Sequence, residues 1–176
     1  MTELWVFGYG SLIWRPGFPY AERCVARLIG AHRALCVYSW VHRGTREHPG
    51  LVLGLDRGGT CRGIAFRVEE ADREAVRAYL REREQVTSVY LERTRDIRLS
   101  DGRSALALTY LVDRSHDQYA GKLDEDTQFR IVSEASGRSG QNREYVVNTA
   151  EHLAELGMPD ASLDRVAKRL KALAPV

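Results

Sequence analysis

The order of hydrophobic patterns along the chain constrains its fold most. Up to residue 112, most apolar residues form short runs or alternate with polar ones, as in β-strands. A helical period interrupts this pattern between residues 70 and 84 and returns after residue 124. Strands therefore come first, one helix interrupts them, and helices follow. This order predicts an α+β fold around a largely antiparallel, barrelled sheet.

The strand pattern contains two expected hairpins. We expect residues 50–55 and 61–68 to pair antiparallel across a turn at residues 56–60, DRGGT. The clearer hairpin has the Asp101-Gly102 pair at its turn, because an Asp-Gly pair readily adopts the positive φ angles of a tight connection. The expected strands are 4–10, 24–40, 50–55, 61–68, 86–99 and 104–112.

Helix signals are clear in two parts of the chain. In the helix expected at residues 70–84, one apolar stripe carries Val76, Tyr79, Leu80 and Arg83. The remaining helices lie in the C-terminal third, where aspartates at the starts and glycines at the ends are typical caps. We expect one from Asp124 to near Gly137, one at about residues 142–156 followed by Gly157, and one opening at Asp160.

Length and composition exclude several classes of protein. With 176 residues, 44% hydrophobic and 28% charged, the chain is predicted to form one domain, residues 1–176. No signal peptide and no membrane-spanning run are evident, so we expect a cytoplasmic protein without a membrane partner. A net charge of +2, spread along the chain, argues against nucleic acid. The spacing of Cys24, Cys36 and Cys61 suggests neither a disulfide framework nor a metal site.

The first candidate for chemistry is GYGSLIW, residues 8–14, a glycine-rich bend after a buried strand. Backbone N–H groups in such a bend lack strand partners and can point together towards an anion such as a carboxylate. Gly8 and Gly10 are equally typical of a kinked barrel strand. The bend is not a phosphate loop, because both phosphate-binding glycine motifs are missing.

The second candidate is a carboxylate at the end of the helix expected at residues 70–84. Glu82 and Glu84 lie on the two borders of its apolar stripe, and periodicity does not choose between them. A half-buried carboxylate there would have a raised pKa, suited to proton transfer. A glutamate in an arginine-rich helix is otherwise typical of a solvated ion pair.

The polar loop HRGTREHPG, residues 42–50, is the third candidate. Its guanidinium groups, on Arg43 and Arg46, could receive a substrate carboxylate. Its histidines, His42 and His48, lack a carboxylate to complete a metal site, so we expect a surface turn. Ser11 has neither a nucleophile-elbow motif nor a His–Asp pair to activate it, so we do not expect a serine nucleophile.

Six blocks of the sequence are distinctive when they are taken together: VFGYGSLIWRPGF (6–18), HRGT…PG (42–50), GGTCRGIAFRV (58–68), YLREREQ (79–85), QYAGKL (118–123) and SGRSGQNREYVVN (136–148). In order and spacing, they resemble the ChaC family of γ-glutamylcyclotransferases. The resemblance covers nearly the whole chain.

This resemblance implies a small mixed, largely antiparallel β-barrel with flanking helices. It also implies cleavage of glutathione to 5-oxoproline and cysteinylglycine, without a cofactor or a metal. By the same resemblance, Glu84 is the general acid/base and Tyr145 lines the pocket. The backbone of the bend would hold the γ-glutamyl group at Gly8, Tyr9, Gly10, Ser11, Leu12 and Ile13.

Two other functions stay open from the sequence. One keeps the reaction but changes the substrate to another γ-glutamyl amine or dipeptide. Recognition of the glycine carboxylate by Arg43 or Arg46 would favour glutathione. The other is a non-catalytic regulatory binding module linked to cation transport, against which the intact Glu84 and bend argue.

Overall fold

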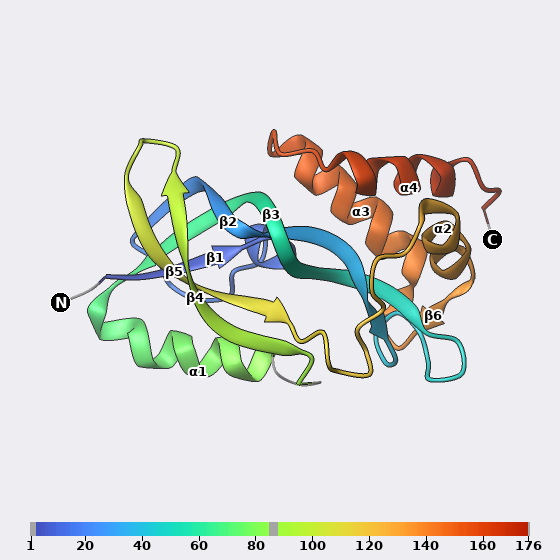
Figure 1. Ribbon diagram of the computed structural model, residues 1–176, viewed down its shortest axis with the longest axis horizontal. Helices are drawn as coiled ribbons and strands as arrows, with labels where there is room; N and C mark the ends of the chain where they lie inside the picture. The colour runs from blue at the N-terminus through green and yellow to red at the C-terminus, as the bar shows by residue number, and fades with distance from the viewer. Residues whose placement is uncertain (1–2, 85–87, 176) are drawn as a thin grey trace. The chain divides into compact units, whose positions relative to one another are not determined.

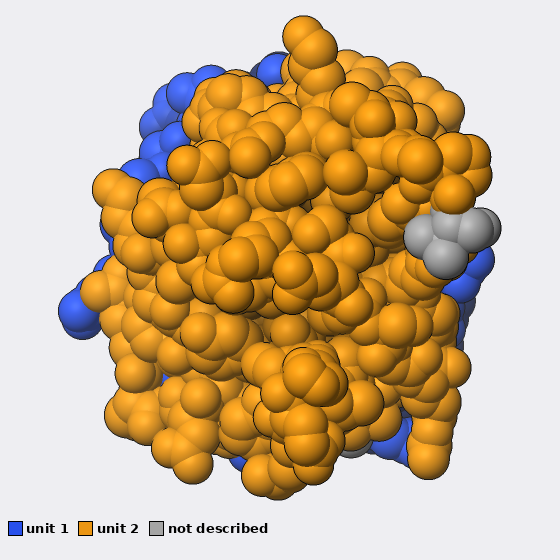
Figure 2. Space-filling view, turned by 90° about the vertical axis from the view of Figure 1, so that its right-hand side faces the viewer, with its two compact units in different colours: residues 1–33, 55–113 blue, residues 34–54, 114–176 orange. Residues whose placement is uncertain are grey.

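A computed structural model describes residues 3–84 and 88–175 of the protein (Figure 1). The chain forms two compact units, which Figure 2 distinguishes in blue and orange. Unit 1 comprises residues 1–33 and 55–113, and unit 2 comprises residues 34–54 and 114–176. The single domain of residues 1–176 stays a prediction.

Strands form a closed barrel in the order β1-β3-β2-β4-β5. Strand β1 pairs antiparallel with β3, with Leu4 opposite Val68, and parallel with β5, with Trp5 opposite Ala107. The barrel is therefore mixed and largely antiparallel, and the predicted fold class is confirmed. The strands are β1 (Leu4–Gly8), β2 (Glu22–Ser39), β3 (Gly50–Val68), β4 (Tyr90–Leu99) and β5 (Ser104–Val112).

The hairpin predicted around Asp101-Gly102 is confirmed. Strands β4 and β5 pair antiparallel from Tyr90 opposite Val112 to Arg98 opposite Ser104. Gly102 has a φ of 94°, a conformation that glycine adopts without the steric cost of a side chain. Residues 86 and 87, which the prediction included in the first strand, lie outside the described residues.

The hairpin predicted between residues 50–55 and 61–68 is wrong, because both segments belong to the single strand β3. Gly58 and Gly59 do have positive φ angles, of 99° and 72°. Such glycines can form a tight turn, but they can also bend a strand that continues in the same direction. The local sequence carries the same signal in both cases, and strand pairing decides between them.

The helix predicted at residues 70–84 is a 3₁₀ turn, η2 (Glu70–Asp72), followed by α1 (Arg73–Glu84). In Figure 1, α1 (green) lies beneath the barrel strands. Val76 and Leu80 of its predicted apolar stripe are buried. Burial of this stripe positions the end of the helix, where the candidate glutamates lie.

Unit 2 contains α2 (Glu125–Glu134), α3 (Asn142–Glu155) and α4 (Ala161–Lys171), with α3 packed against both others. The predicted caps are present, since Asp124 and Asp160 accept hydrogen bonds from backbone N–H groups of α2 and α4. Helix α2 ends before Gly137, because β6 (Ser136–Gly137) pairs with β7 (Gly140–Gln141). None of the described helices has the length and apolar character needed to cross a membrane.

Candidate active site

The bend after β1 is a tight 3₁₀ turn. Strand β1 ends at Gly8, two residues earlier than predicted, and η1 (Ser11–Ile13) follows. The Ile13 N–H donates to the Gly10 carbonyl at 2.9 Å, which closes the turn. Leu12 and Ile13 are buried and anchor the turn in the core of unit 1. Ser11 is exposed.

Close packing explains the glycine at position 8. A Cβ atom there would lie 3.0 Å from the Leu12 Cβ, because the turn folds back over the strand end. Gly63 on the neighbouring strand β3 is more tightly constrained, since its Cβ would overlap the Gly8 carbonyl oxygen. Close packing of the turn therefore accounts for this glycine without a ligand, and the kinked strand stays a prediction.

The same turn leaves backbone donors unused. The N–H groups of Gly10, Ser11 and Leu12 donate to none of residues 3–84 and 88–175. Consecutive N–H groups of this kind form a small positive concavity that suits a carboxylate or an oxyanion. Close packing and ligand binding are therefore compatible explanations of one bend, and anion binding by it stays a prediction.

Glu84 is the last residue of α1, and its side chain is 16% exposed, whereas Glu82 is exposed. Burial raises the pKa of the Glu84 carboxyl above its usual value, and the nearby Arg83 guanidinium partly opposes this shift. A carboxyl group in this environment exchanges protons more readily near neutral pH than a solvated one does. The structure thus separates the two glutamates that periodicity left equivalent.

A second carboxylate near Glu84 has the opposite environment. Arg81 donates to both oxygens of Glu92 on β4, at 3.0 and 3.1 Å, and holds the pKa of Glu92 below its usual value. The buried Tyr110 hydroxyl donates to Glu92 at 3.1 Å. Burial raises the pKa of Tyr110, as do the negative charges of Glu92 and Glu84. Glu92 therefore stays ionised in its contact with Arg81, and Glu84 is the carboxyl suited to exchange a proton.

Arg83 connects the bend to Glu84. Its Nη2 donates to the Ser11 hydroxyl oxygen at 2.8 Å, and its Nε lies 3.6 Å from Glu84 Oε1. One guanidinium group thus contacts both predicted parts of the site, which therefore lie close together in unit 1. A second arginine, Arg33 on β2, donates to the Tyr9 carbonyl at 2.7 Å.

Sequence reasoning missed both arginine contacts. Arg83 gave a signal, because its place on the apolar stripe of α1 is unusual for a charged residue. Arg33 gave none, since nothing in its sequence neighbourhood distinguishes it from the other arginines of a half-exposed strand. Both contacts join residues far apart in sequence.

The other predicted residues lie in unit 2. The hydroxyl of Tyr145, on α3, accepts the Leu53 N–H at 3.1 Å, and the Arg43 guanidinium lies 5.6 Å from the centre of its ring. Arg46 stacks on Trp40 at 4.4 Å. His42 hydrogen-bonds with Ser139 at 2.9 Å. The roles of Tyr145 and these loop residues in substrate binding stay predictions.

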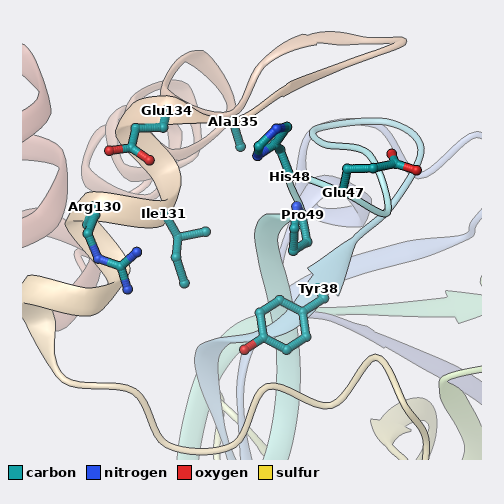
Figure 3. A pocket seen from close by; sticks show the side chains of 8 residues that line it. All are labelled: Tyr38, Glu47, His48, Pro49, Arg130, Ile131, Glu134 and Ala135. Carbon is teal, nitrogen blue, oxygen red and sulfur yellow. The ribbon is translucent and has the colours of Figure 1, made fainter.

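A separate hollow of about 320 Å³ lies on unit 2 (Figure 3). Arg130 and Glu134 project from α2 on one side, and His48 and Pro49 face them from the loop. It contains none of the predicted catalytic or substrate-binding residues. No cluster of three or more metal-binding side chains occurs within residues 3–84 and 88–175.

The fold matches that of solved γ-glutamyl cyclotransferases. The crystal structure of a yeast γ-glutamyl cyclotransferase specific to glutathione superimposes with a TM-score of 0.85 and 22% sequence identity, covering 97% of this chain and 96% of that one. At this identity the match establishes the fold.

The sequence establishes the family. The model of the ChaC-like protein family matches residues 4–173, and the chain belongs to this family. One relative, 35% identical over 97% of this chain and 74% of its own length, is the glutathione-specific γ-glutamylcyclotransferase of Escherichia coli. The glutathione-specific γ-glutamylcyclotransferase 1 of Homo sapiens is 30% identical over 97% of this chain and 78% of its own length. The resemblance inferred from the six sequence blocks is confirmed.

Proposed function

We propose that this protein is a γ-glutamylcyclotransferase that cleaves glutathione to 5-oxoproline and cysteinylglycine in the cytoplasm. The main support for the proposal is that Arg83 contacts both the half-buried Glu84 carboxyl and a bend with unused backbone donors. The names of its relatives support the same reaction and the same substrate.

The reaction needs positioning more than it needs an enzymic nucleophile. The substrate's own α-amine attacks its γ-carbonyl carbon, a C–N bond forms within the γ-glutamyl group, and the bond to the cysteine nitrogen breaks. No water is consumed. Holding amine and carbonyl together makes the attack intramolecular, and well-oriented reactions of this kind reach effective molarities of about 10⁵ to 10⁸ M.

Glu84 supplies the proton transfers in this proposal. As a carboxylate it accepts a proton from the α-amine, and as a carboxylic acid it returns a proton to the departing cysteine nitrogen. The raised pKa suits both steps, because each form of the carboxyl is then accessible near neutral pH. The N–H groups of Gly10, Ser11 and Leu12 would hold the α-carboxylate, which fixes the direction of the amine.

The test is to incubate the purified protein with glutathione and measure 5-oxoproline by mass spectrometry. We expect Glu84→Gln to lower kcat by at least about 10²-fold, the low end for a positioned acid/base. Glu82→Gln is the matched control, because Glu82 is exposed on the same helix. Normal turnover by Glu84→Gln, together with loss of turnover by Glu82→Gln, would show that the wrong carboxylate is assigned.

The same assay separates the alternatives. A panel of γ-glutamyl amines and dipeptides tests whether the cyclisation is specific for glutathione. If wild-type protein yields no 5-oxoproline from any of them, the enzymatic proposal fails, and a non-catalytic binding module remains as the explanation.

A further inference from the structure

We propose that Arg83 is a positioning residue, which fixes the bend after β1 against the end of α1 and thereby sets the distance between the bound substrate and Glu84. The inference deepens the proposed function and rests on it for its kinetic consequences. Its structural part, a bend held in place by Arg83, can be measured without any activity.

The contacts of Arg83 extend from the middle of the bend to the two residues after it. Nη2 donates to the Ser11 hydroxyl at 2.8 Å, at the start of the turn. Nη1 donates to the carbonyl oxygens of Arg15 at 2.6 Å and Pro16 at 3.3 Å, directly after the bend. The guanidinium therefore holds residues 11–16 at two ends. A lysine, with its donors on a single nitrogen, cannot reproduce this fork.

The helix side of this contact is also fixed. Nη1 lies 3.0 Å from the Tyr79 hydroxyl oxygen, one turn earlier on α1. The Tyr79 ring packs edge-on against Phe18, with ring centres 6.3 Å apart. The Arg83 side chain is 23% exposed, so most of its surface packs against the protein. Such a rigid support is what a group that sets the position of another needs.

Arg83 also acts on Glu84 by its charge. Among residues 3–84 and 88–175, the groups that interact electrostatically with Glu84 are Arg83 on α1 and Tyr110 on β5, and Tyr110 in turn contacts Glu92 on β4 with its partner Arg81. Of these, Arg83 lowers the pKa of Glu84, against the effect of burial. Removing its charge should therefore raise the pKa of Glu84 further and leave less carboxylate available as a base at a given pH.

The experiment compares Arg83→Met, which keeps the aliphatic stem, with Arg83→Lys, which keeps the charge. We expect Arg83→Met to lower kcat/KM by about 10²-fold, the size of effect seen when reacting groups are misplaced by about 1 Å. It should also move the acidic limb of the kcat/KM profile to higher pH. Arg83→Lys should lower kcat/KM without moving that limb. Arg98→Met, at an exposed position on β4, is the control.

A second measurement, hydrogen–deuterium exchange of the segment 9–18, does not depend on activity. We expect faster exchange in Arg83→Met than in wild type and in Arg98→Met, since residues 11–16 lose their shared donor. Unchanged exchange in Arg83→Met overturns the inference, whether or not the wild type turns glutathione over. If exchange increases in Arg83→Met but the wild-type protein is inactive, the inference that Arg83 holds the bend stands, and only the cyclotransferase proposal fails. A kcat/KM within about twofold of the control also overturns the inference, because no transition-state stabilisation would then depend on Arg83.

Discussion

Replacing Gly17 with alanine should destabilise unit 1 and lower turnover, because this glycine lies directly against the residues that hold the bend. Gly17 has a φ of 73°, where a side chain costs about 1–2 kcal/mol. A Cβ atom there would also lie 2.1 Å from the Tyr79 hydroxyl oxygen and 2.8 Å from the ring carbon that bears it. The ring must move, and forced repacking of this kind costs about 1–3 kcal/mol.

The two costs together predict a loss of about 2–5 kcal/mol in the free energy of unfolding, measured by urea titration. Gly157→Ala is the control for the backbone cost alone, since Gly157 has a φ of 71° and nothing within 4 Å of the added atom. The difference between the two variants therefore isolates the overlap with Tyr79.

Turnover supplies the functional half of this prediction. Displacement of Tyr79 removes one contact of Arg83, so kcat should fall in Gly17→Ala and stay near wild type in Gly157→Ala. Equal losses of stability in the two variants would refute the argument from packing. A large loss of stability with normal kcat would refute the coupling through Arg83.

Two further predictions concern buried polar groups. Glu84→Gln should gain stability relative to wild type as the pH rises above about 4.5. Because the pKa of Glu84 is raised in the folded state, the unfolded chain ionises first, and wild type loses stability until the folded-state pKa is passed. Melting temperatures across a pH series measure this, and a pH-independent difference would contradict it. Asn142→Ala should lower the free energy of unfolding by at least about 2 kcal/mol, because the fully buried side-chain amide makes hydrogen bonds of 2.8 Å to both the N–H and the carbonyl of Leu51. Asn148→Ala, at an exposed position, is the control in the same urea titration, and equal stabilities of the two variants would contradict the prediction.

Local signals in the sequence predicted the elements whose boundaries depend on neighbouring residues. The Asp101-Gly102 turn, the caps at Asp124 and Asp160 and the apolar stripe of α1 were each read correctly. In each case the interaction that forms the element joins residues a few positions apart. The resemblance to the ChaC family, which rests on six blocks of sequence, also predicted the fold class.

Tertiary structure decided what local signals left open or suggested wrongly. Gly58 and Gly59 indicate a turn by their sequence, but the pairing of β3 with its neighbours keeps that strand continuous. Glu82 and Glu84 are equivalent by periodicity, and only packing of the end of α1 exposes one and half buries the other.

The sequence by itself determined which groups this protein has for chemistry: a glycine-rich bend, a carboxylate at the end of a helix and an arginine beside it. Only the tertiary structure decided that Arg83 contacts Ser11 in the bend and Pro16 after it, 72 and 67 positions away along the chain. The physical reason is that hydrogen bonds and burial depend on distance in space, and the closure of the barrel and the packing of α1 set that distance.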